Sequence, residues 1–76
     1  MTTQTVSQAY LDGISEGRDF QRFCIAAGDT LDRAFITDHI AAIERTMAQG
    51  FSGTMRDFMR GERDFWRSQI KKGKLT

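Results

Sequence analysis

Six basic side chains in the last third of this sequence are the residues whose type and spacing could do chemistry. Consecutive members are four, three, four, four and three positions apart, and the six are Arg56, Arg60, Arg63, Arg67, Lys71 and Lys74. In a helix that turns roughly 100° per residue, this spacing places them within a sector of about 80°. Arginine offers planar, bidentate hydrogen-bond donors to carboxylates and phosphates. The spacing therefore predicts a basic stripe on one helix face, which would bind an acidic protein partner or the phosphates of a nucleic acid.

The basic stripe also has a simpler interpretation, as a helix face that is only solvated. Basic side chains near a helix C-terminus interact favourably with the helix dipole, and Asp57 and Asp64 lie beside the stripe. The net charge of the whole chain is only +1, and no helix-turn-helix pattern precedes the stripe, so DNA is the less favoured ligand. We predict a protein partner, with nucleic acid as the alternative, and leave open whether the stripe is functional or merely solvated.

Charge is distributed unevenly along the 76 residues. Residues 1–50 hold four basic and seven acidic side chains, a net charge of −3, whereas residues 51–76 hold seven basic and three acidic side chains, a net charge of +4. The chain thus has an acidic front and a basic tail. Because the two nearly cancel, the composition does not favour indiscriminate attraction to nucleic acid.

Three further residues are candidates for chemistry, and for each we favour a structural role. Glu62 falls among apolar positions of the helix that carries the stripe, so we expect it to form an ion pair with Arg18, Arg22 or His39. We expect His39 to be a hydrogen-bonded boundary residue and Cys24 a small core residue. One cysteine and one histidine cannot complete a structural zinc site, which needs four ligands. We therefore expect no enzyme activity, no cofactor and no bound metal.

Helical periodicity appears in three segments, which glycines separate. The predicted helices cover about residues 5–27, 30–49 and 53–72. Alternation of apolar and polar residues, which would indicate strands, is missing from the sequence. The predicted fold is therefore all-α, with a single domain over residues 1–76. It is a small three-helix bundle, or a helical hairpin plus a third helix, in which the first and third helices run roughly antiparallel to the second.

Particular residues predict where these helices begin and end. Thr5 would cap the first helix within a capping box, and Gly28 would follow it in the left-handed conformation. Asp29 or Thr30 would cap the second helix. A fresh helix could instead start at Thr37-Asp38, so the sequence leaves open whether the second helix is broken.

A chain of this length buries only about 60% of its unfolded surface, so its core is marginal without further support. A single cysteine allows no internal disulfide. An unusually well-packed helical core or oligomerisation would then supply the support, and of the two we predict a homodimer. The dimer would bury the apolar edge of the third helix, which consists of Met55, Met59, Trp66 and Ile70. The predicted core contains Tyr10, Ile14, Phe20, Phe23, Ile36, Ile40, Ile43, Met47, Phe58, Phe65 and Trp66.

Two glycines, Gly13 and Gly17, lie in the middle of the apolar stripe of the first predicted helix. Each destabilises a helix interior by roughly 1 kcal/mol relative to alanine, so a compensating contact is expected. The two glycines form a flat patch that another backbone or a large ring can approach closely. The candidate rings are Phe58, Phe65 and Trp66, either in the same chain or in a second copy.

Two runs, QAYLDGISEGR (residues 8–18) and RGERDFW (residues 60–66), resemble small helical accessory proteins of tailed temperate bacteriophages and prophages. The resemblance implies a non-enzymatic protein made in the cytoplasm of an infected bacterium, where it binds and modulates a host protein as an inhibitor or adaptor. It assigns a role to no individual residue. The sequence itself has neither the basic, then apolar, start of a signal peptide nor an apolar run of the ~18 residues that a membrane span requires.

Overall fold

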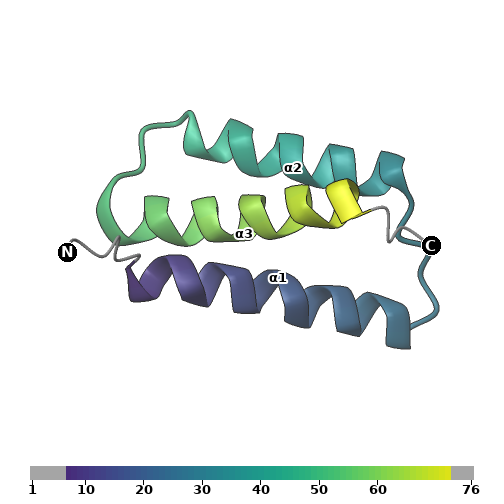
Figure 1. Cartoon of the computed structure of the whole chain (residues 1–76). Helices are drawn as coiled ribbons and strands as arrows, with labels where there is room; N and C mark the ends of the chain where they lie inside the picture. The colour runs from purple at the N-terminus through teal and green to yellow at the C-terminus, as the bar shows by residue number, and fades with distance from the viewer. Residues whose placement is uncertain (1–6, 73–76) are drawn as a thin grey trace.

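The computed structural model describes residues 7–72 of the chain. They form three α-helices, α1 (Gln8–Ala26), α2 (Arg33–Met47) and α3 (Gly53–Lys72). Figure 1 shows α3 lying between the other two, with α1 and α3 running in the same direction and α2 running against both. Both outer helices pack on α3. The predicted all-α fold of three compactly packed helices is confirmed, as is the direction of α2 relative to the others.

The first two helices begin later than the sequence predicted. Ser7 caps α1, because its extended backbone lets the side-chain oxygen accept a hydrogen bond from the Tyr10 backbone N–H at 3.2 Å. The predicted cap, Thr5, lies outside the described residues. Asp32 caps α2 by accepting from the Phe35 backbone N–H at 2.8 Å, so the predicted caps Asp29 and Thr30 are wrong.

The error at the start of α2 has a physical cause in the residue before the cap. Leu31 is only 2% exposed and belongs to the same core cluster as Ile36, which is 1% exposed. Leu31 precedes the cap, and Ile36 is the fourth residue of α2. Apolar residues at these two positions form the contact known as a hydrophobic staple. Residues 29–32 therefore remain outside the helix so that Leu31 can reach the core. From Arg33 onward, α2 is continuous, and Thr37-Asp38 does not break it.

Glycine ends α1 as predicted. Gly28 has a φ of +88°, in the left-handed region that glycine favours. Its backbone N–H donates to the Ile25 carbonyl at 3.0 Å, and the Asp29 N–H donates to the Cys24 carbonyl at 2.9 Å. This pair of hydrogen bonds is the Schellman motif, which satisfies carbonyls that the end of a helix leaves unpaired. The described bounds of α3, Gly53–Lys72, equal the predicted ones.

The core lies along α3, where side chains from α1, α2 and the segment between them meet. Its central residue is Trp66, which is completely buried. The other buried apolar residues are Cys24, Leu31, Ile36, Ile43, Met47 and Met59, with Phe20, Ile40, Phe65 and Ile70 packed partly buried against them. Tyr10, Ile14 and Phe58 are half-buried. One predicted core residue is wrong: Phe23 is 68% exposed, because α1 is an outer helix and buries only a narrow stripe against α3.

Glycines let the backbones of α1 and α3 come into direct contact. A Cβ atom placed on Gly13 would lie 2.0 Å from the Phe58 carbonyl oxygen, and one on Gly61 would lie 2.0 Å from the Tyr10 carbonyl oxygen. A Cβ on Gly17 would lie 2.7 Å from the Phe65 ring. The predicted close approach to the Gly13 and Gly17 patch therefore occurs within one chain, and Phe65 is one of the predicted rings. The contribution of Gly61 from the opposite helix was not predicted.

Candidate functional site

The basic stripe lies on α3, beside the seam with α2. Arg56, Arg60, Arg67 and Lys71 are exposed, and the Arg63 side chain is 21% exposed. Lys74 lies outside the described residues. The described residues of the stripe thus lie at the surface along α3. The carboxylates that contact them determine how much net positive charge the stripe presents.

Three of the arginines are in contact with carboxylates. Arg60 lies 3.5 Å from Asp57, Arg63 lies 3.1 Å from Asp64, and Arg67 donates to Glu44 of α2 at 2.6 Å. At their partial exposure such pairs each stabilise the fold by about 0–1 kcal/mol. Their larger effect is on the surface potential, since each carboxylate offsets one positive charge of the stripe.

Arg56 and Lys71 take part in no ion pair among residues 7–72. They are therefore the two described positions of the stripe that present an uncompensated charge.

The contacts of Asp57 and Asp64 with stripe arginines could be anticipated from the positions of the two aspartates on α3. The contact of Glu44 could not, because it depends on the register between α2 and α3.

Tyr10 of α1 joins the stripe from the other side. Its hydroxyl donates a hydrogen bond to Asp64 at 2.6 Å, and the Arg60 guanidinium carbon lies 5.8 Å from the centre of its ring. The hydrogen bond to Asp64, followed by burial, raises the pKa of Tyr10 above its ordinary value, although Arg60 and Arg63 act in the opposite direction. Sequence reasoning placed Tyr10 in the core and missed this polar role.

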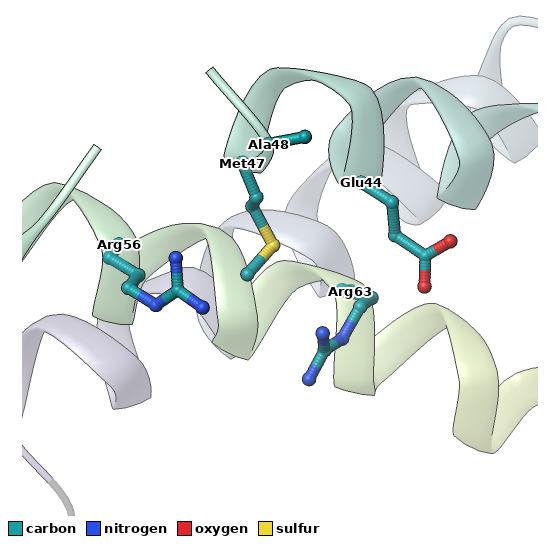
Figure 2. Close-up of a pocket in the computed structure, with 5 residues that line it drawn as sticks. All are labelled: Glu44, Met47, Ala48, Arg56 and Arg63. Atoms are coloured by element: carbon teal, nitrogen blue, oxygen red, sulfur yellow. The ribbon is translucent and has the colours of Figure 1, made fainter. Parts of the chain in front are cut away.

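A hollow of about 280 Å³ opens between α2 and α3 at the start of the stripe. Glu44, Met47, Ala48, Arg56 and Arg63 line it. Figure 2 shows the guanidinium groups of Arg56 and Arg63 on either side of the tip of Met47, with the Glu44 carboxylate beyond Arg63. Met47 is only 7% exposed, so it forms an apolar floor. The hollow can accept a group that combines a negative charge with a short apolar portion.

A second hollow, of about 240 Å³, lies elsewhere along the α2–α3 seam. Its lining comprises His39, Ala42, Ile43, Thr46, Met59 and Glu62. Burial raises the pKa of Glu62, and the nearby charge of Glu16 raises it further. The predicted ion pair of Glu62 with Arg18, Arg22 or His39 is wrong: among residues 7–72 Glu62 forms no ion pair, and Arg22 lies 3.9 Å from Asp19 instead.

His39 is held between aromatic rings. Its ring stacks on Phe20 at 5.4 Å and on Phe35 at 5.9 Å, and it meets the Trp66 ring edge-on at 5.3 Å between centroids. Within the described chain, the His39 Nε2 and the Trp66 Nε1 are buried without a hydrogen-bond partner. The expectation of a hydrogen-bonded boundary histidine is therefore wrong at this nitrogen. Burial lowers the pKa of His39, which favours the neutral ring.

Cys24 is 4% exposed and belongs to the core, as expected. Burial, and secondarily the charge of Asp29, raise the pKa of its thiol, which disfavours the reactive thiolate. Over residues 7–72, no group of three or more histidine, cysteine, aspartate or glutamate side chains is placed to hold a metal ion.

The apolar edge predicted for a dimer is largely used inside the chain. Met59 is 7% exposed and Trp66 is completely buried, while Ile70 is partly buried against the core. Of the four residues of this edge, only Met55, 52% exposed, presents a large apolar surface to solvent. The excess apolar surface that motivated the homodimer is therefore much smaller than the sequence suggested.

Comparison of the chain with protein-family models, with curated proteins and with solved structures found no match. None of the helices within residues 7–72 combines the length and apolar character needed to cross a membrane.

Proposed function

We propose that this protein binds an acidic segment of another protein through the basic stripe of α3. The observation that carries the proposal is the hollow in which Arg56 and Arg63 lie on either side of Met47. An aspartate or glutamate side chain would place its carboxylate between the two guanidinium groups and its methylene groups against the buried thioether. Charge-assisted, bidentate hydrogen bonds of this kind are among the stronger polar contacts in proteins.

The carboxylates within the stripe favour a protein over a nucleic acid. A regular row of phosphates along α3 would lie close to Asp57, Asp64 and Glu44, which contact Arg60, Arg63 and Arg67. A protein segment can instead place its acidic groups at Arg56 and Lys71 and neutral groups between them. Nucleic-acid binding through the same face is the second candidate.

The resemblance to accessory proteins of temperate phages and prophages supports a more specific form of the proposal. The partner would be a host protein in the bacterial cytoplasm, and this protein would act on it without catalysis, as an inhibitor or adaptor. The buried Cys24, whose pKa is raised, offers no activated nucleophile for an enzymatic alternative. A homodimer also stays a proposal, with Met55 as the exposed member of the apolar edge predicted for it.

The test compares two double charge-reversal variants in affinity capture from bacterial lysate. Arg56→Glu with Lys71→Glu changes the two described stripe positions that take part in no ion pair among residues 7–72, so none of the ion pairs described above is lost. Arg18→Glu with Arg45→Glu makes the same change in charge at exposed positions of α1 and α2 that take part in no ion pair among residues 7–72. We expect a protein captured by the wild type to be lost with the stripe variant and retained with the control.

Equal capture by the stripe variant, with unchanged helical circular dichroism, would contradict the proposal. Arg60, Arg63 and Arg67 are less suitable positions for this test, because reversing them places a carboxylate beside Asp57, Asp64 or Glu44. The nucleic-acid alternative is tested with a labelled 20-base-pair duplex at increasing salt. Under this alternative, the affinity for DNA falls as the salt concentration rises, with a slope set by the number of phosphates contacted. If the protein does not bind the duplex at low salt, the alternative is excluded.

A further inference from the structure

The hollow that contains Glu62 belongs to a second surface, on a different side of α3 from the stripe. Arg60 and Glu62 are two positions apart in the sequence, which places their side chains about 160° apart around the helix. The lining residues His39, Ala42, Ile43 and Thr46 come from α2, whereas Met59 and Glu62 come from α3. This surface plays no part in the function proposed above.

The charge of this surface is negative. Glu62 of α3 is half-buried, and Glu16 of α1 is close enough for its charge to act on it. His39 of α2 faces the same hollow and favours its neutral form because of burial. Neither carboxylate has a basic partner within residues 7–72. Two carboxylates without a counter-charge, one of them partly desolvated, favour a ligand that brings a cation.

The remainder of the surface is apolar. Met59, Ile43 and Ala42 line the hollow, and Met55, one helical turn before Met59, is 52% exposed. The stacked rings of Phe20, His39 and Phe35 continue the surface, and Phe35 is 36% exposed. Exposed methionine and aromatic side chains at a concave site are typical of surfaces that receive a helix of another protein.

We propose that this surface is a docking groove for a basic amphipathic helix of a partner protein. An aliphatic side chain of that helix would enter the hollow between Ile43 and Met59. A lysine or arginine one turn away would reach the carboxylates of Glu16 and Glu62. The helix would thus supply both the apolar contact and the counter-charge that the groove lacks.

A second copy of this chain fits the groove less well than a separate basic helix. The helix that carries positive charge in this chain is α3, and its apolar residues Met59 and Trp66 are already buried against α2. Docking of the basic stripe into the groove of another copy would also be head-to-tail, which generates open assemblies rather than closed dimers. Self-association through the groove is therefore an outcome that the experiment must detect.

The test uses a blocked 15-residue amphipathic peptide composed of leucine and lysine as the probe, with binding followed by isothermal titration calorimetry. We expect Glu16→Gln with Glu62→Gln to weaken binding at least about tenfold, the equivalent of one lost charge-assisted hydrogen bond of about 1.4 kcal/mol. This variant should remain folded, because it removes a partly desolvated charge. The matched control, Asp12→Asn with Asp19→Asn, neutralises two exposed carboxylates of α1 and should bind like the wild type.

Two further measurements make the result specific. Thr46→Arg places a cation in the hollow and should also abolish peptide binding. Arg56→Glu with Lys71→Glu should leave peptide binding unchanged, which would show that the peptide binds in this groove and not at the basic stripe. The proposal is overturned if the wild type does not bind the peptide, or if the Glu16 and Glu62 variant binds it as tightly as the wild type. It is also overturned if light scattering finds self-association that Thr46→Arg abolishes, since the occupant would then be a second copy.

Discussion

Replacement of Gly13 or Gly61 by alanine should destabilise this protein, although alanine is the better helix former. A methyl group on Gly13 would lie 2.0 Å from the Phe58 carbonyl oxygen and 2.9 Å from the Glu62 backbone nitrogen. One on Gly61 would lie 2.0 Å from the Tyr10 carbonyl oxygen and 3.2 Å from the Ile14 backbone nitrogen. All four contacts are with backbone atoms of a packed helix, which cannot move without moving the helix.

The size of the effect follows from two opposing contributions. Alanine stabilises a helix interior by roughly 1 kcal/mol relative to glycine. Overpacking typically destabilises by about 1–3 kcal/mol, and by more where the neighbour cannot shift. Separating α1 from α3 also loosens Tyr10, Phe58 and Phe65 along the contact. We therefore expect a net loss of about 1–2 kcal/mol or more, out of a total stability of roughly 4–11 kcal/mol for a chain of this size.

Thermal unfolding followed by circular dichroism measures this loss. For domains of 60–100 residues, each kcal/mol corresponds to roughly 4–8 °C in Tm. Gly17→Ala is the matched variant, because its methyl group would meet the Phe65 ring at 2.7 Å, a side chain that can partly turn away. We expect the loss to be larger for Gly13 and Gly61 than for Gly17. Alanine variants of Gly13 and Gly61 that are both more stable than the wild type would refute the contact between α1 and α3.

Two other predictions concern buried and hydrogen-bonded side chains. His39→Phe removes a buried nitrogen that lacks a partner and keeps the stacked ring, so the free energy of unfolding should rise by about 1 kcal/mol in urea titration at neutral pH. Folding lowers the pKa of His39, so below about pH 6.5 the imidazole binds a proton more readily in the unfolded chain than in the folded protein. The free energy of unfolding of the wild type should therefore fall as the pH is lowered through this range, and that of His39→Phe should lack this part of the decrease. An equal pH dependence for both proteins would contradict the burial of His39. Tyr10 is the sole tyrosine, so ultraviolet titration of the folded protein should give a phenol midpoint above about 10, and Asp64→Asn should lower it. An unchanged midpoint in Asp64→Asn would exclude the hydrogen bond as the cause.

The parts of this fold that depend on local sequence were predictable. The range of α3 and the left-handed Gly28 follow from glycine placement and apolar periodicity, which act over a few residues. The start of α2 was not predictable in the same way. Asp29, Thr30 and Asp32 are all competent caps, and the burial of Leu31, a tertiary contact, selects the last of them.

Burial and pairing between helices were harder to predict, because they depend on the order and register of the helices. Phe23 lies beside Phe20 on the wheel of α1, and periodicity alone cannot tell that an outer helix buries one and exposes the other. The contacts of Tyr10 with Asp64 and of Arg67 with Glu44 join residues 54 and 23 positions apart. Gly61 did carry a local signal, since it is a glycine in a helix interior like Gly13.

The central position of α3 limits which of its residues can reveal function by mutation. One side of the helix, with Gly61, contacts α1 through its backbone, and another, with Met59 and Trp66, forms the core with α2. A substitution at these positions changes the fold before it changes any surface. Arg56 and Lys71 are exposed and unpaired within the described chain, so their charge can be altered alone. Because both proposed surfaces include α3, loss of binding at either is informative only for variants that keep the packing of α1 and α2 on α3.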